Sequence, residues 1–118
     1  MDFIHKIYAC GFKISLIIAA DFIPIKSIKS IFQIKSNHFL KSTREIAAHY
    51  NIPFYVEVHN SLKVVKLIKK YRINIGVISG ARILNASIFS VIRHGVLNFH
   101  PGILPYVRGL DSILWSIY

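Results

Sequence analysis

The sequence predicts an α/β fold, a three-layer, mostly parallel Rossmann-like sheet with helices on both faces. Three observations lead to this prediction. Apolar runs of strand length alternate with amphipathic stretches of helical length. The run over residues 14–20 is apolar on both faces, which is typical of an inner strand covered by helices on both sides. The chain has 118 residues, 53% of them hydrophobic, which suits one domain and leaves no room for two.

Start and stop residues delimit the expected elements. Gly11 ends a first helix that begins near residue 3. Ser42 or Thr43 caps a second helix, which has Glu45 in its first turn and ends at Asn51. The expected order is helix 3–11, strand 14–20, an irregular basic segment 22–40, a helix to 50, strand 54–58, a helix to 71, strand 73–79, helix 85–93, strand 96–99, a turn-rich loop 101–109 and the start of a helix over 110–118.

The helix that ends at residue 71 has a basic face, and Asn60 or Ser61 caps its start. Its basic side chains recur at helical spacing, which indicates the solvated face of an amphipathic helix rather than a nucleic-acid site. The formal net charge of +10 nevertheless favours an anionic substrate or binding partner. The basic residues are Lys63, Lys66, Lys69, Lys70 and Arg72, and the apolar face is expected to consist of Leu62, Val65 and Ile68.

Composition excludes several kinds of site. The single cysteine, Cys10, excludes an internal disulfide framework and a cysteine-rich zinc site, and the six histidines show no metal-ligand spacing. The longest apolar stretch, residues 14–25, contains Asp21 and Pro24 and is shorter than the about 20 residues of a membrane-spanning helix. We therefore expect a cytoplasmic protein with no metal and no membrane partner.

The candidate chemistry follows the last two expected strands. Strands of a parallel sheet end at one edge, where ligands bind, and residues 80–84 and 100–109 leave the sheet there. Asn98 and His100 are two residues apart, so they share one face of their strand. An amide donor beside a histidine suits a developing oxyanion. The alternative is structural, with His100 capping the strand end and Asn98 bonding to a loop carbonyl.

Residues 98–109 form the most specific motif in the chain. They are Asn-Phe-His-Pro-Gly-Ile-Leu-Pro-Tyr-Val-Arg-Gly, followed by Ile-Leu-Trp-Ser-Ile over residues 113–117. This motif resembles the signature of the folate-dependent formyltransferases, which include glycinamide ribonucleotide, methionyl-tRNA and amino-sugar formyltransferases. Residues 80–84, Gly-Ala-Arg-Ile-Leu, are similar to the folate-pocket segment of that family. Residues 47–53 resemble the family's helix leading into an Ile-Pro strand.

The resemblance implies transfer of a formyl group from 10-formyltetrahydrofolate to an acceptor amine, a reaction of one-carbon metabolism. The acceptor stays open among an amino sugar, an aminoacyl-tRNA and a glycinamide nucleotide, and a nucleic-acid partner is expected only for tRNA. Ile83 and Leu84 could instead serve core packing, and Arg108 could have a structural role in its loop; these are the alternatives to the roles that the resemblance implies. The implied roles are oxyanion stabilisation by Asn98 and His100, folate binding by Arg82, Ile83 and Leu84, and acceptor binding by Pro105 and Arg108.

The chain also departs from the family pattern. The family's catalytic Asp would lie beyond Tyr118, and Asp111 fits a helix start rather than that role. The family's first, central strand would precede the opening helix. Residues 1–118 are therefore expected to form a single partial formyltransferase domain, whose sheet lacks its first and C-terminal strands. A complementing chain or a homo-oligomer would complete it. The competing hypothesis is a catalytically inactive remnant that keeps only folate or partner binding.

Overall fold

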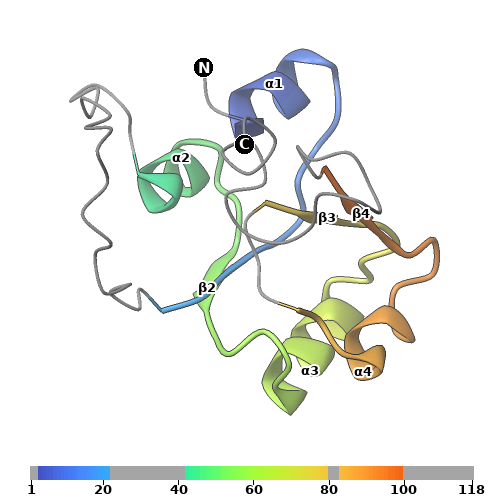
Figure 1. The fold of residues 1–118 in the computed structure, drawn as a ribbon. Helices are drawn as coiled ribbons and strands as arrows, with labels where there is room; N and C mark the ends of the chain where they lie inside the picture. Colours follow the sequence, from blue (N-terminus) through green and yellow to red (C-terminus); the bar gives the residue numbers. More distant parts are fainter. Residues whose placement is uncertain (1–2, 22–41, 80–82, 100–118) are drawn as a thin grey trace, which may run out of the picture.

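The computed structural model describes residues 3–21, 42–79 and 83–99. Helices and strands alternate along these segments (Figure 1), as the hydrophobic pattern predicts. The expected basic segment 22–40, the loop 101–109 and the helix over 110–118 lie outside the described residues. The elements are α1 (Phe3–Ala9), β1 (Ile17–Ala19), α2 (Thr43–His49), β2 (Phe54–Val56), α3 (Leu62–Lys70), β3 (Gly76–Ile78), α4 (Ala86–Phe89) and β4 (Val96–Asn98).

The strands form two parallel pairs. In the first pair Ile17 of β1 lies opposite Phe54 of β2, and in the second Gly76 of β3 lies opposite Val96 of β4. Parallel strands joined by helices are compatible with the predicted α/β class. In the described part of the chain the two pairs are separate two-stranded sheets. A single Rossmann-like sheet therefore stays a prediction.

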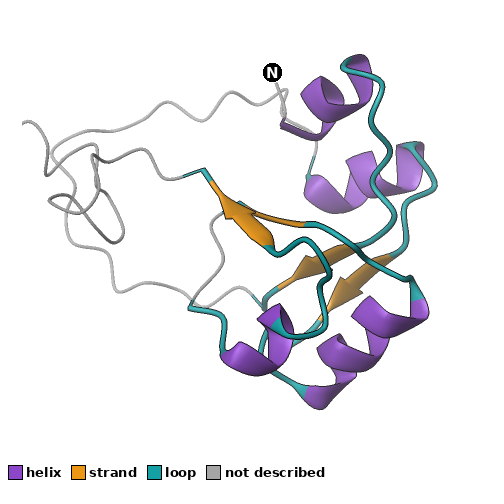
Figure 2. Ribbon diagram, turned by 90° about the vertical axis from the view of Figure 1, so that its right-hand side faces the viewer, coloured by secondary structure: helices purple, strands orange, loops and turns teal. Residues whose placement is uncertain are grey.

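The helices lie on two sides of the strands (Figure 2), and each side has its own apolar cluster. α1 and α2 pack on the first strand pair, whereas α3 and α4 pack on the second. This arrangement buries the apolar face of every helix against strand side chains. The α1/α2 cluster consists of Ile4, Ile46, Ala47 and Ile52, and the α3/α4 cluster consists of Val64, Ile68, Ile88 and Ile92.

β1 lies between the two clusters. Its Ile17 packs against the α1/α2 cluster, and the adjacent Ile18 packs against the α3/α4 cluster. Successive side chains of a strand point to opposite faces, so this strand contributes to both clusters. At Ile17 and Ile18 the run thus packs against helix-backed clusters on both faces, as predicted, whereas its inner position in a sheet stays a prediction, because β1 pairs only with β2 among the described residues.

The caps of α2 follow the local sequence. Ser42 is the N-cap, and its hydroxyl accepts a hydrogen bond from the Glu45 backbone N–H at 3.3 Å. The Glu45 carboxylate in turn accepts from the Ser42 backbone N–H at 2.6 Å, which completes a capping box. After the helix Asn51 has φ of 53°, a left-handed conformation that asparagine tolerates well. Both ends of this helix were predicted correctly.

Three predicted details are wrong. Leu62 is 79% exposed, because the buried stripe of α3 consists of Val64, Leu67 and Ile68; of the expected apolar face Ile68 is buried and Val65 is half-buried. The strand expected over 14–20 pairs only over Ile17–Ala19, since its partner begins after Pro53, whose nitrogen cannot donate to the ladder. α4 ends at Phe89 rather than Arg93. The β-branched residues Val91 and Ile92 follow the helix in a tighter turn, in which the Ile92 N–H donates to the Phe89 carbonyl.

Candidate functional site

The carboxyl ends of β3 and β4 form one edge of the molecule. Ile78 lies opposite Asn98 at the last paired position of the two strands. The segments that follow the strands therefore start side by side, as the sequence predicts. Asn98 is exposed at this edge. His100, the second residue of the motif, lies outside the described residues, as do Pro105 and Arg108.

The segment after β3 is held by the side chain of Asn60. The Asn60 amide nitrogen donates to the Ile83 carbonyl at 3.0 Å. The Asn60 carbonyl oxygen accepts from the backbone N–H of Asn85 at 2.9 Å. One side chain thus bridges the backbone on both sides of Leu84. The sequence predicts Asn60 or Ser61 as a helix cap, and the chain separation of 23 and 25 residues gives no local signal of this contact.

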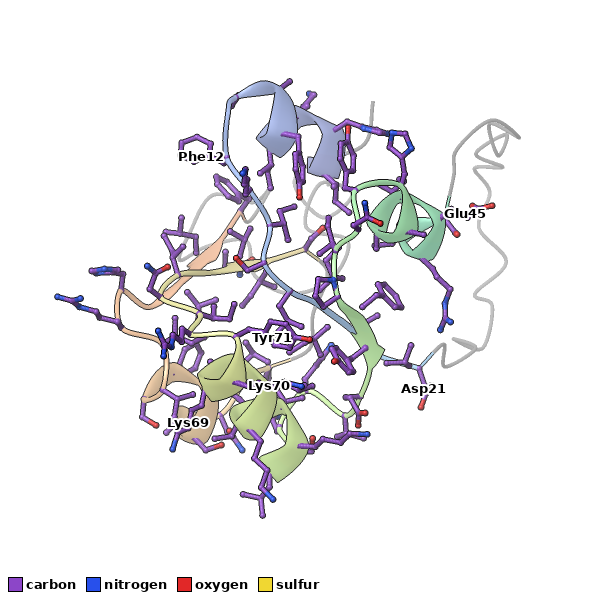
Figure 3. All side chains as sticks on the ribbon, turned by 180° about the vertical axis from the view of Figure 1, so that it is seen from behind. Phe12, Asp21, Glu45, Lys69, Lys70 and Tyr71 are labelled. Carbon is purple, nitrogen blue, oxygen red and sulfur yellow. The ribbon has the colours of Figure 1, made fainter. Side chains whose placement is uncertain are left out.

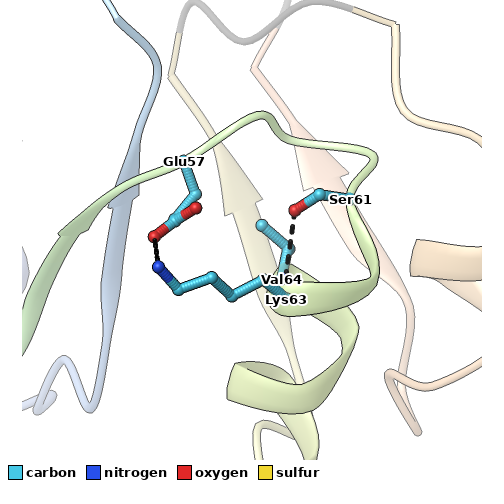
Figure 4. A network of polar contacts seen from close by, with 4 residues as sticks. All are labelled: Glu57, Ser61, Lys63 and Val64. Atoms are coloured by element: carbon cyan, nitrogen blue, oxygen red, sulfur yellow. Dashed lines mark hydrogen bonds and ion pairs between the residues drawn. The ribbon is translucent and has the colours of Figure 1, made fainter.

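The turn that carries Asn60 is fixed at the start of α3 (Figure 4). Ser61, not Asn60, is the N-cap of α3, and its hydroxyl accepts from the Val64 N–H at 3.3 Å. Lys63 forms an ion pair with Glu57, which precedes the turn. The Ser61 N–H donates to the Val58 carbonyl at 2.9 Å and closes the turn. These contacts orient Asn60 toward the segment after β3.

The two described residues of the expected folate segment differ in environment. Ile83 is 91% exposed, so its side chain is available as an apolar wall. Leu84 is half-buried and packs against the α3/α4 cluster, which agrees with the core-packing alternative. Arg82 lies outside the described residues. The Ile83 carbonyl and the Asn85 N–H already bond to Asn60.

A pair of tyrosines ties α3 to the first strand pair. The hydroxyls of Tyr55 on β2 and Tyr71 at the C-cap of α3 are 3.0 Å apart. The hydrogen bond to Tyr55 raises the pKa of Tyr71 above its ordinary value, with smaller contributions from desolvation and from repulsion by the Tyr55 phenolate. Tyr71 therefore stays neutral at neutral pH.

Two kinds of feature are absent from the segments that the structure describes. They contain no group of three or more His, Cys, Asp or Glu side chains placed to hold a metal ion. None of their helices is long and apolar enough to cross a membrane.

These features define an α/β protein with a candidate polar site where two parallel strands end. Comparison with known proteins gives a more particular similarity. The chain is 27% identical over 81 residues to a methionyl-tRNA formyltransferase of Clostridium perfringens (strain SM101 / Type A), covering 66% of this chain and 26% of that protein. It is 29% identical over 75 residues to a methionyl-tRNA formyltransferase of Chlorobium limicola, covering 63% of this chain and 24% of that protein.

These similarities suggest the formyltransferase family and go no further. The chain spans about a quarter of the length of the curated relatives it matches. No family model matches the chain, and no solved structure matches it.

Proposed function

We propose that this chain carries the formyl-transfer site of a folate-dependent formyltransferase. The formyl donor is 10-formyltetrahydrofolate and the acceptor is an amine. The observation that supports the proposal most is the position of Asn98 at the carboxyl end of β4, paired with the end of β3. The Asn-x-His motif thereby begins beside the segment that resembles the family's folate pocket.

The proposed reaction joins the acceptor nitrogen to the formyl carbon and breaks the bond from that carbon to N10 of the folate. The Asn98 amide donates a hydrogen bond to the oxygen that becomes negative in the tetrahedral intermediate. His100 donates to the same oxygen and passes the proton lost by the acceptor amine toward the leaving folate nitrogen. Tetrahydrofolate and the N-formylated acceptor are the products.

The remaining residues of the proposal hold the two reactants. Ile83, with its exposed side chain, forms an apolar wall for the flat pterin ring, and Arg82 and Leu84 supply backbone groups to the ring edge. Pro105 and Arg108 flank the acceptor, and Arg108 pairs with an anionic group on it. The names of the relatives make methionyl-tRNA the first acceptor to test, before a nucleotide-linked amino sugar and glycinamide ribonucleotide.

The test measures formyl transfer from 10-formyltetrahydrofolate to these three acceptors with the purified chain. We expect His100→Ala to lower kcat about 10²–10⁴-fold, the usual contribution of a general acid or base. Asn98→Asp keeps the side-chain size but removes the N–H donor, and is expected to lower kcat about 10²–10³-fold. His49→Ala is the matched control, because His49 is exposed on α2 and outside the proposed site.

Folate binding, measured by equilibrium dialysis, separates the remaining outcomes. Turnover that is unaffected by His100→Ala would contradict the mechanism. Folate binding without turnover would support the alternative of a non-catalytic chain that keeps only the binding function. The absence of both turnover and folate binding would refute both hypotheses.

A further inference from the structure

Residues 83–85, which follow β3, have two backbone groups that a distant side chain satisfies. These groups are the Ile83 carbonyl and the Asn85 N–H, and no backbone group within the described residues bonds to either of them. Asn60 donates to the first and accepts from the second. A primary amide carries both a donor and an acceptor, so it can bridge these two groups as a neighbouring peptide unit would.

The other side chains of this segment do not replace that bridge. Leu84 anchors the segment by packing against the α3/α4 cluster. The Asn85 side-chain oxygen accepts from the Ser87 hydroxyl at 2.5 Å, which is a contact within the start of α4. Ile83 is 91% exposed. Without the Asn60 bonds the backbone can therefore turn about the Leu84 anchor, and the exposed Ile83 side chain turns with it.

The turn before α3 holds Asn60 in place for this contact. Ser61 caps α3 directly after Asn60, and its N–H closes the turn. The ion pair between Lys63 and Glu57 spans the same turn (Figure 4). Although Asn60 is exposed, its backbone is thus fixed by neighbours on both sides. Asn60 therefore links the position of the turn after β2 to the position of the segment after β3.

We propose that Asn60 is a positioning residue for the folate donor, because it holds Ile83 where its exposed side chain forms the apolar wall of the folate pocket. This role rests on the proposed function, which places folate at Ile83. Asn60 acts through its bond to the Ile83 carbonyl and does not itself touch the folate. A ligand that binds only one position of a segment loses apparent affinity as fewer molecules hold that position.

The first test measures binding of 10-formyltetrahydrofolate to the full chain by equilibrium dialysis. Asn60→Ala removes two neutral hydrogen bonds and is expected to raise the Kd about 5- to 30-fold. In a turnover assay the KM for the folate is expected to rise by the same factor. The kcat is expected to stay unchanged, because Asn98 lies on a different strand, β4.

Ser42→Ala is the matched control for general loss of stability. It removes the capping box of α2 and lowers stability through a comparable set of hydrogen bonds. Figure 3 shows Glu45, the partner of Ser42 in that box, well apart from Lys69 and Lys70 on α3. This variant is expected to leave the Kd unchanged. Equal weakening by Ser42→Ala and Asn60→Ala would overturn the proposal, since it would indicate partial unfolding rather than a lost position.

Asn60→Asp separates the two hydrogen bonds. It keeps an acceptor for the Asn85 N–H but places a carboxylate oxygen against the Ile83 carbonyl, where no proton is left to share. The Kd is expected to rise about 3- to 10-fold, while the Asn85 amide keeps most of its protection from hydrogen exchange. An unchanged Kd in this variant would overturn the role of the bond to Ile83.

Ile83→Ala tests whether Asn60 acts through the apolar wall. In this background Asn60→Ala is expected to raise the Kd by a smaller factor than in the wild-type chain, because the side chain that it positions is gone. The same factor in both backgrounds would overturn the proposal. A wild-type chain that binds no folate would refute the proposed function and this role with it, whereas folate binding unaffected by Asn60→Ala would refute the role of Asn60 alone.

Discussion

Replacing Asn60 with alanine removes both hydrogen bonds that hold the segment after β3. The lost bonds are the ones to the Ile83 carbonyl, at 3.0 Å, and from the Asn85 N–H, at 2.9 Å. A neutral hydrogen bond contributes about 0.5–1.5 kcal/mol net, and Asn60 is exposed, so the two together are expected to contribute about 1–2 kcal/mol. The loss is local, because Asn60 belongs to neither apolar cluster.

Hydrogen exchange at the Asn85 amide measures this loss directly. A change of one to two kcal/mol in local opening corresponds to about 5- to 30-fold faster exchange. Asn60→Asp keeps the acceptor for the Asn85 N–H and loses only the donor to Ile83, so it is expected to preserve most of the protection. Asn74→Ala is the control, because the backbone carbonyl of Asn74, and not its side chain, accepts the bond from His94. Unchanged Asn85 exchange in Asn60→Ala would refute the role assigned to Asn60.

Three further predictions concern stability. The Ile46 side chain is only 1% exposed in the α1/α2 cluster, so Ile46→Ala is expected to lower the free energy of unfolding, measured by urea titration, by about 2–5 kcal/mol. The exposed control Val58→Ala is expected to lower it by less than about 0.5 kcal/mol. Similar losses in the two variants would contradict the assigned core. Ser42→Ala removes the capping box of α2 and is expected to lower stability by about 0.5–2 kcal/mol, and an unchanged melting temperature would disprove the cap's contribution. Tyr55→Phe removes the hydrogen bond that raises the pKa of Tyr71. Because the folded-state pKa is raised, that stabilisation is complete below about pH 10 and is lost as pH rises through the raised value, so urea titrations should show the stability gap between wild type and variant closing in alkali. A gap that is constant with pH would contradict this cause.

Features set by neighbours in the sequence could be predicted well. The Ser42 cap, the Glu45 partner and the Asn51 exit of α2 depend on contacts within one or two turns, and all three are present. The order of helices and strands also follows from local periodicity. The apolar face of α3 was predicted correctly at Ile68 and wrongly at Leu62, because side chains at several adjacent positions of that helix are apolar and only packing decides which of them are buried.

Features that join distant segments could not be predicted. The contacts of Asn60 connect a turn before α3 to backbone groups more than twenty residues away, and no pattern in the sequence encodes them. The division of the strands into two pairs likewise depends on tertiary packing. For the candidate site, the pattern of strands and helices predicted that Asn98 ends a strand beside the end of β3, and the pairing of Asn98 with Ile78 agrees with this position. The roles of Asn98 and His100 in catalysis stay predictions.

The two apolar clusters have a consequence for how the molecule opens. Each strand pair has its own helices and its own buried side chains, and among the described residues Ile18, the Tyr55–Tyr71 bond and the Glu57–Lys63 ion pair connect the halves. Such an arrangement favours two cooperative unfolding units of different stability over one all-or-none transition. The edge that ends at Asn98 belongs to the α3/α4 unit alone. A ligand bound there therefore stabilises that unit directly, and the α1/α2 unit gains stability through the contacts that connect the two units.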